Sequence, residues 1–307
     1  MIEKVGEVSL NYRHYPGEDF YSDGKVEDEI LDIVKNNPEE DFTKIINERL
    51  DWAILYHLSK QRTNIISWYP FEEDAKILEI GSGCGAITGT LAEKGNKVVC
   101  IDLSKKRSEI NAHRNKEKQN IEILVGNFQD IEQELERDFD YITLIGTFEY
   151  GQAYIEGIHP YHGMLRAILS HLKPGGKIFI AIENKYGLKY WAGCQEDHVG
   201  RFFENMEGYQ NTDGARTFSR QELTKIIEEC GCRDYYFYYP YPDYKFPKTI
   251  YSDAYLPHIG ELNQNVCNFD RRRLVLFDEG KVYNQIIADE LYPTFANSFL
   301  IEIRKEV

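Results

Sequence analysis

The sequence predicts an α/β fold in which helices cover both faces of a mostly parallel sheet. Five short apolar runs follow one another between residues 76 and 184, and they are nearly continuous rather than alternating. Runs of this kind are typical of parallel strands that are buried on both faces. Stretches with helical spacing separate the runs, as the crossover connections of a parallel sheet require.

The part of the chain before these runs reads mainly as helix. Residues 25–69 carry apolar side chains at helical spacing. We therefore expect an N-terminal helical extension over residues 1–70 and a main domain over residues 71–307. Ser104 is well placed to cap the helix after the second strand. The five strands are expected at residues 76–81, 97–102, 121–127, 139–146 and 177–184.

Further elements follow the fifth strand. Ser219 and Glu222 have the spacing of a capping box, and Gly231 is placed to end the helix that they begin. Two later strands are expected at residues 234–244 and 297–305. The connections over residues 185–217 and 245–296 are unusually long, and connections of that length are typically lids or binding elements.

Composition narrows the class of protein. With 36 basic and 51 acidic residues among 307, the net charge is −15, which disfavours a nucleic-acid partner. No apolar run approaches the roughly 20 residues of a membrane span, and the N-terminus lacks the apolar core of a signal peptide. The six cysteines form no regular framework, so we expect free thiols and a cytoplasmic location.

A glycine-rich stretch follows the first expected strand. In "ILEIGSGCGAITGTLAEKG", residues 77–95, Gly81, Gly83 and Ala86 fit the pattern G-x-G-x-x-A of nucleotide-bearing cofactor sites. Asp102, at the end of the second strand, could accept hydrogen bonds from both hydroxyls of a ribose. A nicotinamide dinucleotide and S-adenosylmethionine both carry that ribose. The loop and Asp102 are therefore compatible with either cofactor.

Three other features favour S-adenosylmethionine. Glu79 near the mouth of the first strand would repel a pyrophosphate, "LKPGGKIFI" leads through a Pro-Gly-Gly turn into the fifth strand, and about 75 residues precede the first strand. With these features, residues 70–307 resemble class I S-adenosylmethionine-dependent methyltransferases. The resemblance implies a Rossmann-like sheet of seven strands whose last pair is antiparallel.

The resemblance also implies which residues contact the cofactor. Residues near its methionine end would be Glu79, Gly81, Ser82, Gly83 and Gly85. Asp102 would bind the ribose and Leu103 would flank the adenine. Asn127 would meet the adenine amino group, with Phe128 beside it. Gly146 and Thr147, at the end of the fourth strand, would lie under the reactive sulfur.

A narrower resemblance concerns the acceptor. The segment "IENKYGLKYWAGCQEDHVGRFF", followed by "EGY" and "RTFSRQEL", is similar to a segment of methyltransferase domains that accompany glycosyltransferases in bacterial surface-polysaccharide assembly. This resemblance implies a small-molecule or glycan acceptor and an association with glycosyltransferases.

Three titratable residues are candidates for the base. Glu149 and Glu183 follow strands four and five, where an open α/β sheet places its ligand crevice, and His198 lies in the first long insertion. A hydroxyl acceptor benefits from such a base. Each candidate also has a structural interpretation: Glu149 as a helix cap, Glu183 as a partner of backbone amides and His198 as a surface residue. No metal site is expected, because no Asp/Asn cluster stands at the strand ends.

Aromatic residues suggest a sugar pocket. Ten of the 21 residues at 235–255 are Tyr or Phe, and their alternation places some in the core. Tyr186, Tyr190, Trp191, Arg201 and the tyrosines at 238–244 could line the pocket. We therefore expect O-methylation of a sugar or glycan-linked acceptor. The alternatives are a nicotinamide-dependent oxidoreductase, an aminopropyl transferase that uses a decarboxylated relative of the cofactor, and a non-catalytic binding module.

Overall fold

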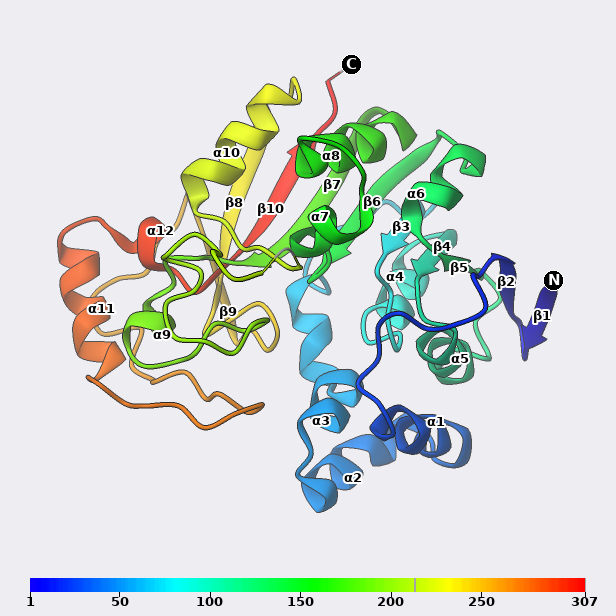
Figure 1. Ribbon diagram of the computed structural model, residues 1–307, viewed down its shortest axis with the longest axis horizontal. Coiled ribbons are helices and arrows are strands. Elements are labelled where there is room, and N and C mark those ends of the chain that lie inside the picture. Colours follow the sequence, from blue (N-terminus) through cyan, green and yellow to red (C-terminus); the bar gives the residue numbers. More distant parts are fainter. Residues whose placement is uncertain (213, 307) are drawn as a thin grey trace. The chain divides into compact units, whose positions relative to one another are not determined.

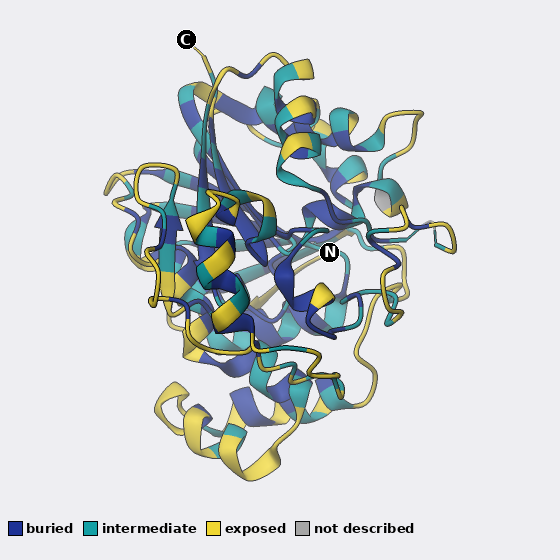
Figure 2. Cartoon of the chain, turned by 90° about the vertical axis from the view of Figure 1, so that its left-hand side faces the viewer, coloured by how far each residue is buried: buried dark blue, intermediate teal, exposed yellow. Residues whose placement is uncertain are grey.

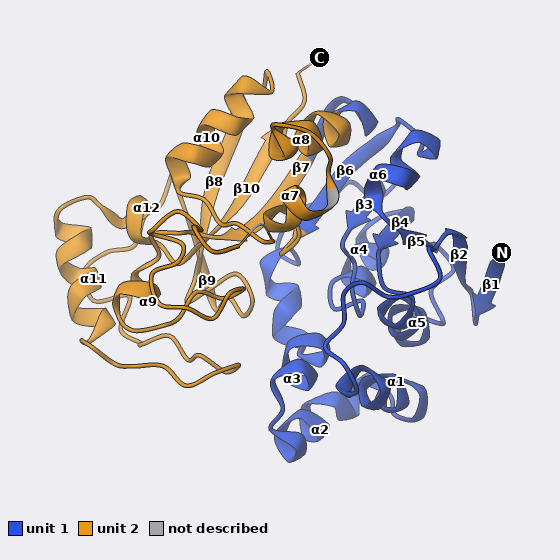
Figure 3. Cartoon of the chain, viewed as in Figure 1, with its two compact units in different colours: residues 1–144, 170–177 blue, residues 145–169, 178–307 orange. Residues whose placement is uncertain are grey.

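The computed structural model describes residues 1–212 and 214–306 (Figure 1). The chain divides into two compact units (Figure 3). Unit 1 comprises Met1–Leu144 and Ser170–Lys177, and unit 2 comprises Ile145–Leu169 and Ile178–Val307. The glycine-rich stretch therefore belongs to unit 1, whereas both long insertions belong to unit 2.

The elements occur in the following places. The strands are β1 (Ile2–Val5), β2 (Val8–His14), β3 (Lys76–Ile80), β4 (Lys97–Asp102), β5 (Ile121–Gly126), β6 (Phe139–Ile145), β7 (Leu172–Glu183), β8 (Asp234–Tyr241), β9 (Thr249–Ser252) and β10 (Ser298–Arg304). The α-helices are α1 (Val26–Asn36), α2 (Phe42–Arg49), α3 (Trp52–Leu58), α4 (Thr88–Lys94), α5 (Lys105–Arg114), α6 (Phe128–Ile131), α7 (Gly151–Tyr154), α8 (Pro160–His171), α9 (Leu188–Trp191), α10 (Arg220–Glu229), α11 (Glu279–Ala288) and α12 (Tyr292–Phe295). Short 3₁₀ helices are η1 (Glu39–Asp41), η2 (Lys60–Ile65), η3 (Glu132–Glu134) and η4 (Phe148–Tyr150).

Across residues 1–212 and 214–306, the strands form one ten-stranded sheet in the order β1-β2-β5-β4-β3-β6-β7-β10-β8-β9. Strands β2, β5, β4, β3 and β6 pair in parallel, whereas β1–β2, β10–β8 and β8–β9 are antiparallel. The α/β class and the antiparallel pairing of the two late strands are confirmed. The expected number of seven strands was wrong, because β1 and β2 extend one edge of the sheet and β9 forms the other.

The unexpected hairpin occupies the beginning of the expected helical extension. Val8 and Leu10 are fully buried and alternate with less buried residues, as a strand with one covered face requires. Gly6 connects β1 to β2 with φ at 58°, and a Cβ atom there would lie 2.3 Å from the carbonyl oxygen of Lys116. The hairpin therefore needs glycine at this position. The division at residue 70 stays a prediction.

The helices that follow the hairpin are amphipathic and share a core with the glycine-rich stretch. Ile30, Ile54 and Leu58, from α1 and α3, belong to one buried cluster with Cys84 and with Ile110 of α5. Figure 2 colours the chain by burial: the strands are mainly dark blue, for buried, and the outer faces of helices are yellow, for exposed. Helix packing thus supports the loop from within unit 1.

The predicted cap residues are confirmed. The Ser104 side chain accepts a hydrogen bond from the Arg107 N–H at the start of α5, and Ser219 and Glu222 form a complete capping box at α10. One boundary differs from the prediction: β7 begins at Leu172 and therefore includes the Pro-Gly-Gly segment that we expected to form a turn. Within that segment Gly175 has φ at 77°, a conformation that glycine adopts without strain.

The two long insertions contain secondary structure of their own. Residues 185–217 include α9, and residues 245–296 include β9, α11 and α12 (Figure 1). Their role as lids stays a prediction.

Two expectations from composition concern thiols and membranes. All six cysteines are free, and burial raises the pKa of the Cys84 and Cys100 thiols, so both are protonated at neutral pH. Among the described residues, no helix is both long enough and apolar enough to cross a membrane.

Candidate active site

The glycine loop follows β3 and is held by hydrogen bonds to the end of β4. Gly81, Gly83 and Gly85 have positive φ angles of 76°, 50° and 75°. The N–H groups of Gly81 and Ser82 donate to the carbonyl oxygen of Ile101, at 2.8 and 3.2 Å. The loop is therefore a rigid turn whose conformation depends on glycine.

The glycines have different surroundings. A Cβ atom at Gly85 would lie 2.4 Å from the side-chain oxygen of Asn111, so this glycine lets α5 pack closely. A Cβ atom at Gly83 would meet no other atom within 4 Å, which leaves open space beside the loop. The adjacent Ser82 hydroxyl is buried and has no hydrogen-bond partner within the described chain. Open space and a polar atom without a partner fit a bound cofactor.

Glu79 lies behind the loop rather than in open space. Its carboxylate accepts a hydrogen bond from the Thr88 hydroxyl at 2.6 Å, and only 4% of the residue is exposed. Burial raises the pKa of Glu79 to about 7, and the nearby charge of Asp102 contributes to this rise. Glu79 therefore links β3 to α4. Its expected contact with the methionine end of the cofactor stays a prediction.

Asp102 supports the loop with both carboxylate oxygens. One accepts from the Gly83 N–H at 2.7 Å and the other from the Ser104 N–H at 2.9 Å. Burial raises the pKa of Asp102, and these hydrogen bonds partly oppose the shift. Because each carboxylate oxygen has two lone pairs, the same residue can also accept hydrogen bonds from a ribose. Leu103, beside it, is partly exposed.

The expected adenine residues follow β5. The Asn127 side-chain oxygen accepts from the Gln129 N–H at 3.1 Å and thereby caps α6. Phe128 is buried next to it, with 6% of its surface exposed. Asn127 thus has a structural role, and its contact with adenine stays a prediction.

Gly146 and Thr147 follow the end of β6. Gly146 has φ at 72°, and a Cβ atom there would lie 2.7 Å from the hydroxyl oxygen of Tyr244. Any side chain at this position would collide with that tyrosine. Thr147 is partly exposed. The proximity of both residues to a cofactor sulfur stays a prediction.

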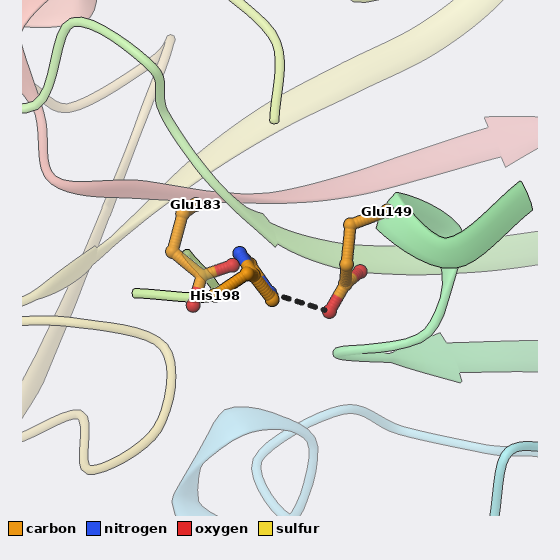
Figure 4. A group of neighbouring side chains, drawn as sticks. All are labelled: Glu149, Glu183 and His198. Carbon is orange, nitrogen blue, oxygen red and sulfur yellow. Dashed lines mark ion pairs between the residues drawn. The ribbon is translucent and has the colours of Figure 1, made fainter. Parts of the chain in front are cut away.

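The three candidate bases lie together within unit 2 (Figure 4). Glu149 lies on η4, Glu183 is the last residue of β7, and His198 lies in the first insertion. The His198 Nε2 atom is 3.8 Å from a carboxylate oxygen of Glu149, which makes an ion pair rather than a hydrogen bond. The fold thus brings together three residues that are far apart in the sequence.

A fourth residue fixes the imidazole. Glu196 accepts from His198 Nδ1 at 2.9 Å and from the His198 backbone N–H at 2.8 Å. Burial opposes the charged imidazole, but the contacts with Glu149 and Glu196 outweigh it and raise the pKa of His198 well above its usual value. His198 is therefore a cation at neutral pH and cannot itself accept a proton.

Each of the two candidate carboxylates keeps one oxygen without a protein partner. Oε2 of Glu149 and Oε2 of Glu183 are buried and accept no hydrogen bond from any described residue. Burial raises the pKa of Glu149, while His198 opposes the shift. Glu149 is 1% exposed and its side chain does not cap α7, so its interpretation as a helix cap is wrong. The His198 side chain is only 12% exposed, so its interpretation as a surface residue is wrong too.

A buried ion network surrounds Glu183, and sequence reasoning did not find it. Lys245 donates to Glu183 and to Asp197, the latter at 2.8 Å, while Lys189 donates to Asp243 at 2.6 Å. Burial opposes the charge of Lys245, but the two carboxylates raise its pKa well above the usual value. Lys245 and Asp243 follow β8 inside an aromatic run, so no local motif marked them. One local pattern was present: in "QEDHV", residues 195–199, Glu196 stands two residues before His198, close enough to bind its imidazole.

The residues of the expected aromatic pocket differ in their exposure. Among the residues of the run after α10, Phe237, Tyr239, Tyr241 and Tyr244 are buried, as core residues would be. Tyr190 is also buried, and its hydroxyl donates to Asp197 at 2.5 Å. Trp191 and Arg201 are exposed, and Tyr186 is partly exposed. Their contact with an acceptor stays a prediction.

Glu149, Glu183 and His198 also form the group with metal-ligand geometry in the described part of the chain, since one possible ligand atom from each lies within 4.8 Å of the others. A cation would have to displace the imidazole proton and compete with the Lys245 ammonium that binds Glu183. Both existing positive charges disfavour a divalent metal. The expectation of no metal stays a prediction.

Comparison with known proteins gives the family. Residues 52–236 match the family described as methyltransferase domain. The cypemycin N-terminal methyltransferase of a Streptomyces species is 32% identical over 105 residues, which are 34% of this chain and 40% of that protein. The malonyl-acyl-carrier protein O-methyltransferase of Priestia megaterium is 24% identical over 177 residues, which are 56% of this chain and 59% of that protein.

The chain thus spans 40% and 59% of the lengths of these two curated relatives. A solved structure of a SAM-dependent methyltransferase from Archaeoglobus fulgidus superposes with a TM-score of 0.51 and 14% identity, covering 83% of this chain and all of that one. This similarity concerns the fold. Since the family match covers more than half of the 307 residues, the chain belongs to the methyltransferase domain family and has the fold of SAM-dependent methyltransferases.

Proposed function

We propose that the protein transfers the methyl group of S-adenosylmethionine to a hydroxyl oxygen of a sugar or glycan-linked acceptor, with Glu149 as the base. S-adenosylmethionine is the methyl donor, and the glycine loop with Asp102 is its site in unit 1. The observation that carries the acceptor chemistry is the buried Oε2 atom of Glu149, which has no partner among the residues described. An unpaired buried carboxylate oxygen is costly unless a ligand donates to it.

The reaction needs one bond to form and one to break. The acceptor oxygen attacks the methyl carbon while the bond from carbon to sulfur breaks, so that S-adenosylhomocysteine leaves as a neutral thioether. The hydroxyl proton passes to Glu149. Alignment supplies most of the acceleration in such a transfer, and a base adds about 10²- to 10⁴-fold.

The neighbouring charges suit this role. The raised pKa of Glu149 brings its basicity closer to neutral pH, where a general base is most effective. The His198 cation stabilises the carboxylate that must be present before the proton arrives. Glu196 holds the imidazole, so it acts as a positioning residue. Glu183 is held by Lys245 and serves as a binding residue.

Two features support a polyhydroxyl acceptor. Glu149 and Glu183 each offer one buried oxygen that needs a donor, and two neighbouring hydroxyls of a sugar ring provide two donors. In addition, residues 182–223 resemble the methyltransferase domains that accompany glycosyltransferases, and association with a glycosyltransferase belongs to the proposal. The name of the Priestia megaterium relative also specifies transfer to oxygen.

The family match argues against a nicotinamide-dependent oxidoreductase and against a non-catalytic module. To test the acceptor, the protein is incubated with methyl-labelled S-adenosylmethionine and panels of sugars, nucleotide sugars, glycans, lipids, peptides and RNA. We expect label on a sugar oxygen. Label only in peptide, lipid or RNA would overturn the sugar assignment and leave methyl transfer standing.

A further inference from the structure

Arg62 is a buried cation that has no ion-pair partner among the described residues. It lies in η2, directly after α3, and 5% of the residue is exposed. Its Nε and Nη1 atoms are buried and donate no hydrogen bond, and the described residues place no carboxylate within ion-pair distance of it. Its guanidinium carbon lies 4.0 Å from the centre of the Tyr56 ring, a cation–π contact.

The other arginine buried nearby is fully paired. Arg107 of α5 donates to Glu27 at 2.7 Å and to Asp23 at 2.8 Å. A charge that is removed from water is strongly destabilising unless an opposite charge or several hydrogen bonds compensate it. The Tyr56 ring compensates Arg62 only in part. The unpaired donors therefore indicate an anionic ligand.

Arg62 lies in unit 1, close to the glycine loop. Its charge acts on the Glu79 carboxylate at the end of β3 and opposes the rise in the pKa of that group. The helix that precedes it belongs to the same buried cluster as the loop, since Ile54 and Leu58 share that cluster with Cys84. Arg62 therefore belongs to the part of unit 1 that surrounds the site that we assign to the cofactor.

Part of the hydrogen-bonding capacity of the loop is already used within the protein. The N–H groups of Gly81 and Ser82 donate to Ile101, that of Gly83 to Asp102 and that of Gly85 to Ser82. Helix α4 begins only at Thr88 and is seven residues long. The N–H groups of Cys84 and Ala86 donate no hydrogen bond to any described residue, but they carry no net charge. Arg62 offers a full positive charge and two buried donors, which a carboxylate binds more strongly than neutral donors.

We propose that Arg62 binds the α-carboxylate of S-adenosylmethionine and thereby selects the intact cofactor over its decarboxylated form. The inference rests on the proposed function, since it takes S-adenosylmethionine as the ligand of the loop. A decarboxylated cofactor would leave the buried guanidinium unpaired, and its ammonium would no longer be offset by a carboxylate. Arg62 thus separates methyl transfer from the aminopropyl-transferase alternative that the loop sequence leaves open.

The test compares two ligands by calorimetry on the full chain. S-adenosylhomocysteine carries the carboxylate, whereas 5′-methylthioadenosine lacks the whole amino-acid part. We expect Arg62→Met to weaken S-adenosylhomocysteine about tenfold to a hundredfold, the range for a lost charge-assisted hydrogen bond, and Arg62→Lys to restore part of the loss. Binding of 5′-methylthioadenosine should change less than about threefold.

The ligand-free variants show whether folding accounts for a loss. Because Arg62 is unpaired, Arg62→Met should melt at the wild-type temperature or above it, whereas the matched control Arg107→Met should melt lower. Equal weakening of both ligands, or no weakening of either, would overturn the role of Arg62. If the wild type binds 5′-methylthioadenosine but not S-adenosylhomocysteine, the assignment of Arg62 fails. If it binds neither ligand, the cofactor assignment itself fails.

Discussion

The glycine loop of unit 1 and the charged cluster of unit 2 are both buried, but they are built in opposite ways. The loop consists of consecutive residues whose N–H groups donate mainly to Ile101 and Asp102 at the end of β4. Its Ser82 hydroxyl has no partner among the described residues. The cluster gathers side chains from distant parts of the chain into ion pairs.

The two regions can therefore bind different kinds of ligand. A backbone turn with open space at Gly83 suits a ligand that lies against the main chain. A cluster with two unpaired carboxylate oxygens suits a donor-rich ligand that is particular to this protein. We therefore assign the cofactor to the loop and the acceptor chemistry to the cluster.

The largest effect should follow from removing the base. Glu149→Gln keeps the size of the side chain but cannot take up the acceptor proton, so we expect kcat to fall by about 10²- to 10⁴-fold. Affinity for S-adenosylhomocysteine should stay within about twofold of the wild type. Glu207→Gln, an exposed position, is the matched control and should leave both quantities unchanged. A normal kcat for Glu149→Gln would remove this residue as the base.

A second prediction concerns the pH dependence of the loop. Glu79 has a pKa of about 7 when folded and about 4.5 when unfolded, so the folded protein binds the proton more tightly. Its stabilising contribution is therefore complete below pH 4.5 and is lost as the pH rises through 7. Between those values the wild type should lose up to about 3 kcal/mol of unfolding free energy relative to Glu79→Gln.

Urea denaturation of both proteins at several pH values measures this difference. The Gln side chain can still accept the Thr88 hydrogen bond, so the two proteins should differ mainly in titration. Stability curves that run parallel between pH 4.5 and 7 would show that Glu79 does not titrate in this range.

The smallest effect should follow from removing metal ions. The Lys245 ammonium already binds Glu183, and the charged His198 imidazole forms an ion pair with Glu149. We therefore expect methyl-transfer activity to be unchanged by EDTA and by added Mg²⁺ or Mn²⁺. Activity that EDTA abolishes and a divalent ion restores would make Glu149, Glu183 and His198 a metal site instead.

The loop could be predicted from the sequence because its signals are local. Gly81, Gly83 and Asp102 stand at fixed spacings around one turn, and the Ser104 and Ser219 caps likewise act within a few residues. Such signals depend on backbone conformation, which neighbouring residues determine. The hairpin β1–β2 was missed. It too has a local signal, since Val8 and Leu10 alternate with polar residues after Gly6.

The cluster could be predicted only in part. Glu149 and Glu183 were found because they follow parallel strands, whose carboxyl ends share one edge of a sheet. Lys245 and Asp197 were missed, since they lie in different long insertions and their pairing depends on how these insertions fold against each other. Arg62 was missed for a similar reason: in the sequence it is one polar residue of an amphipathic helical stretch, and only burial shows that it has no partner.

We assign S-adenosylmethionine to the loop with Asp102. Calorimetry with S-adenosylhomocysteine and NAD tests this assignment. We predict that the wild type binds S-adenosylhomocysteine and not NAD. Asp102→Ala should weaken that binding about tenfold to a hundredfold, because hydrogen bonds of about 1.5–3 kcal/mol to the ribose are lost. Tight binding of NAD by the wild type, or an unchanged affinity for S-adenosylhomocysteine in Asp102→Ala, would contradict the claim.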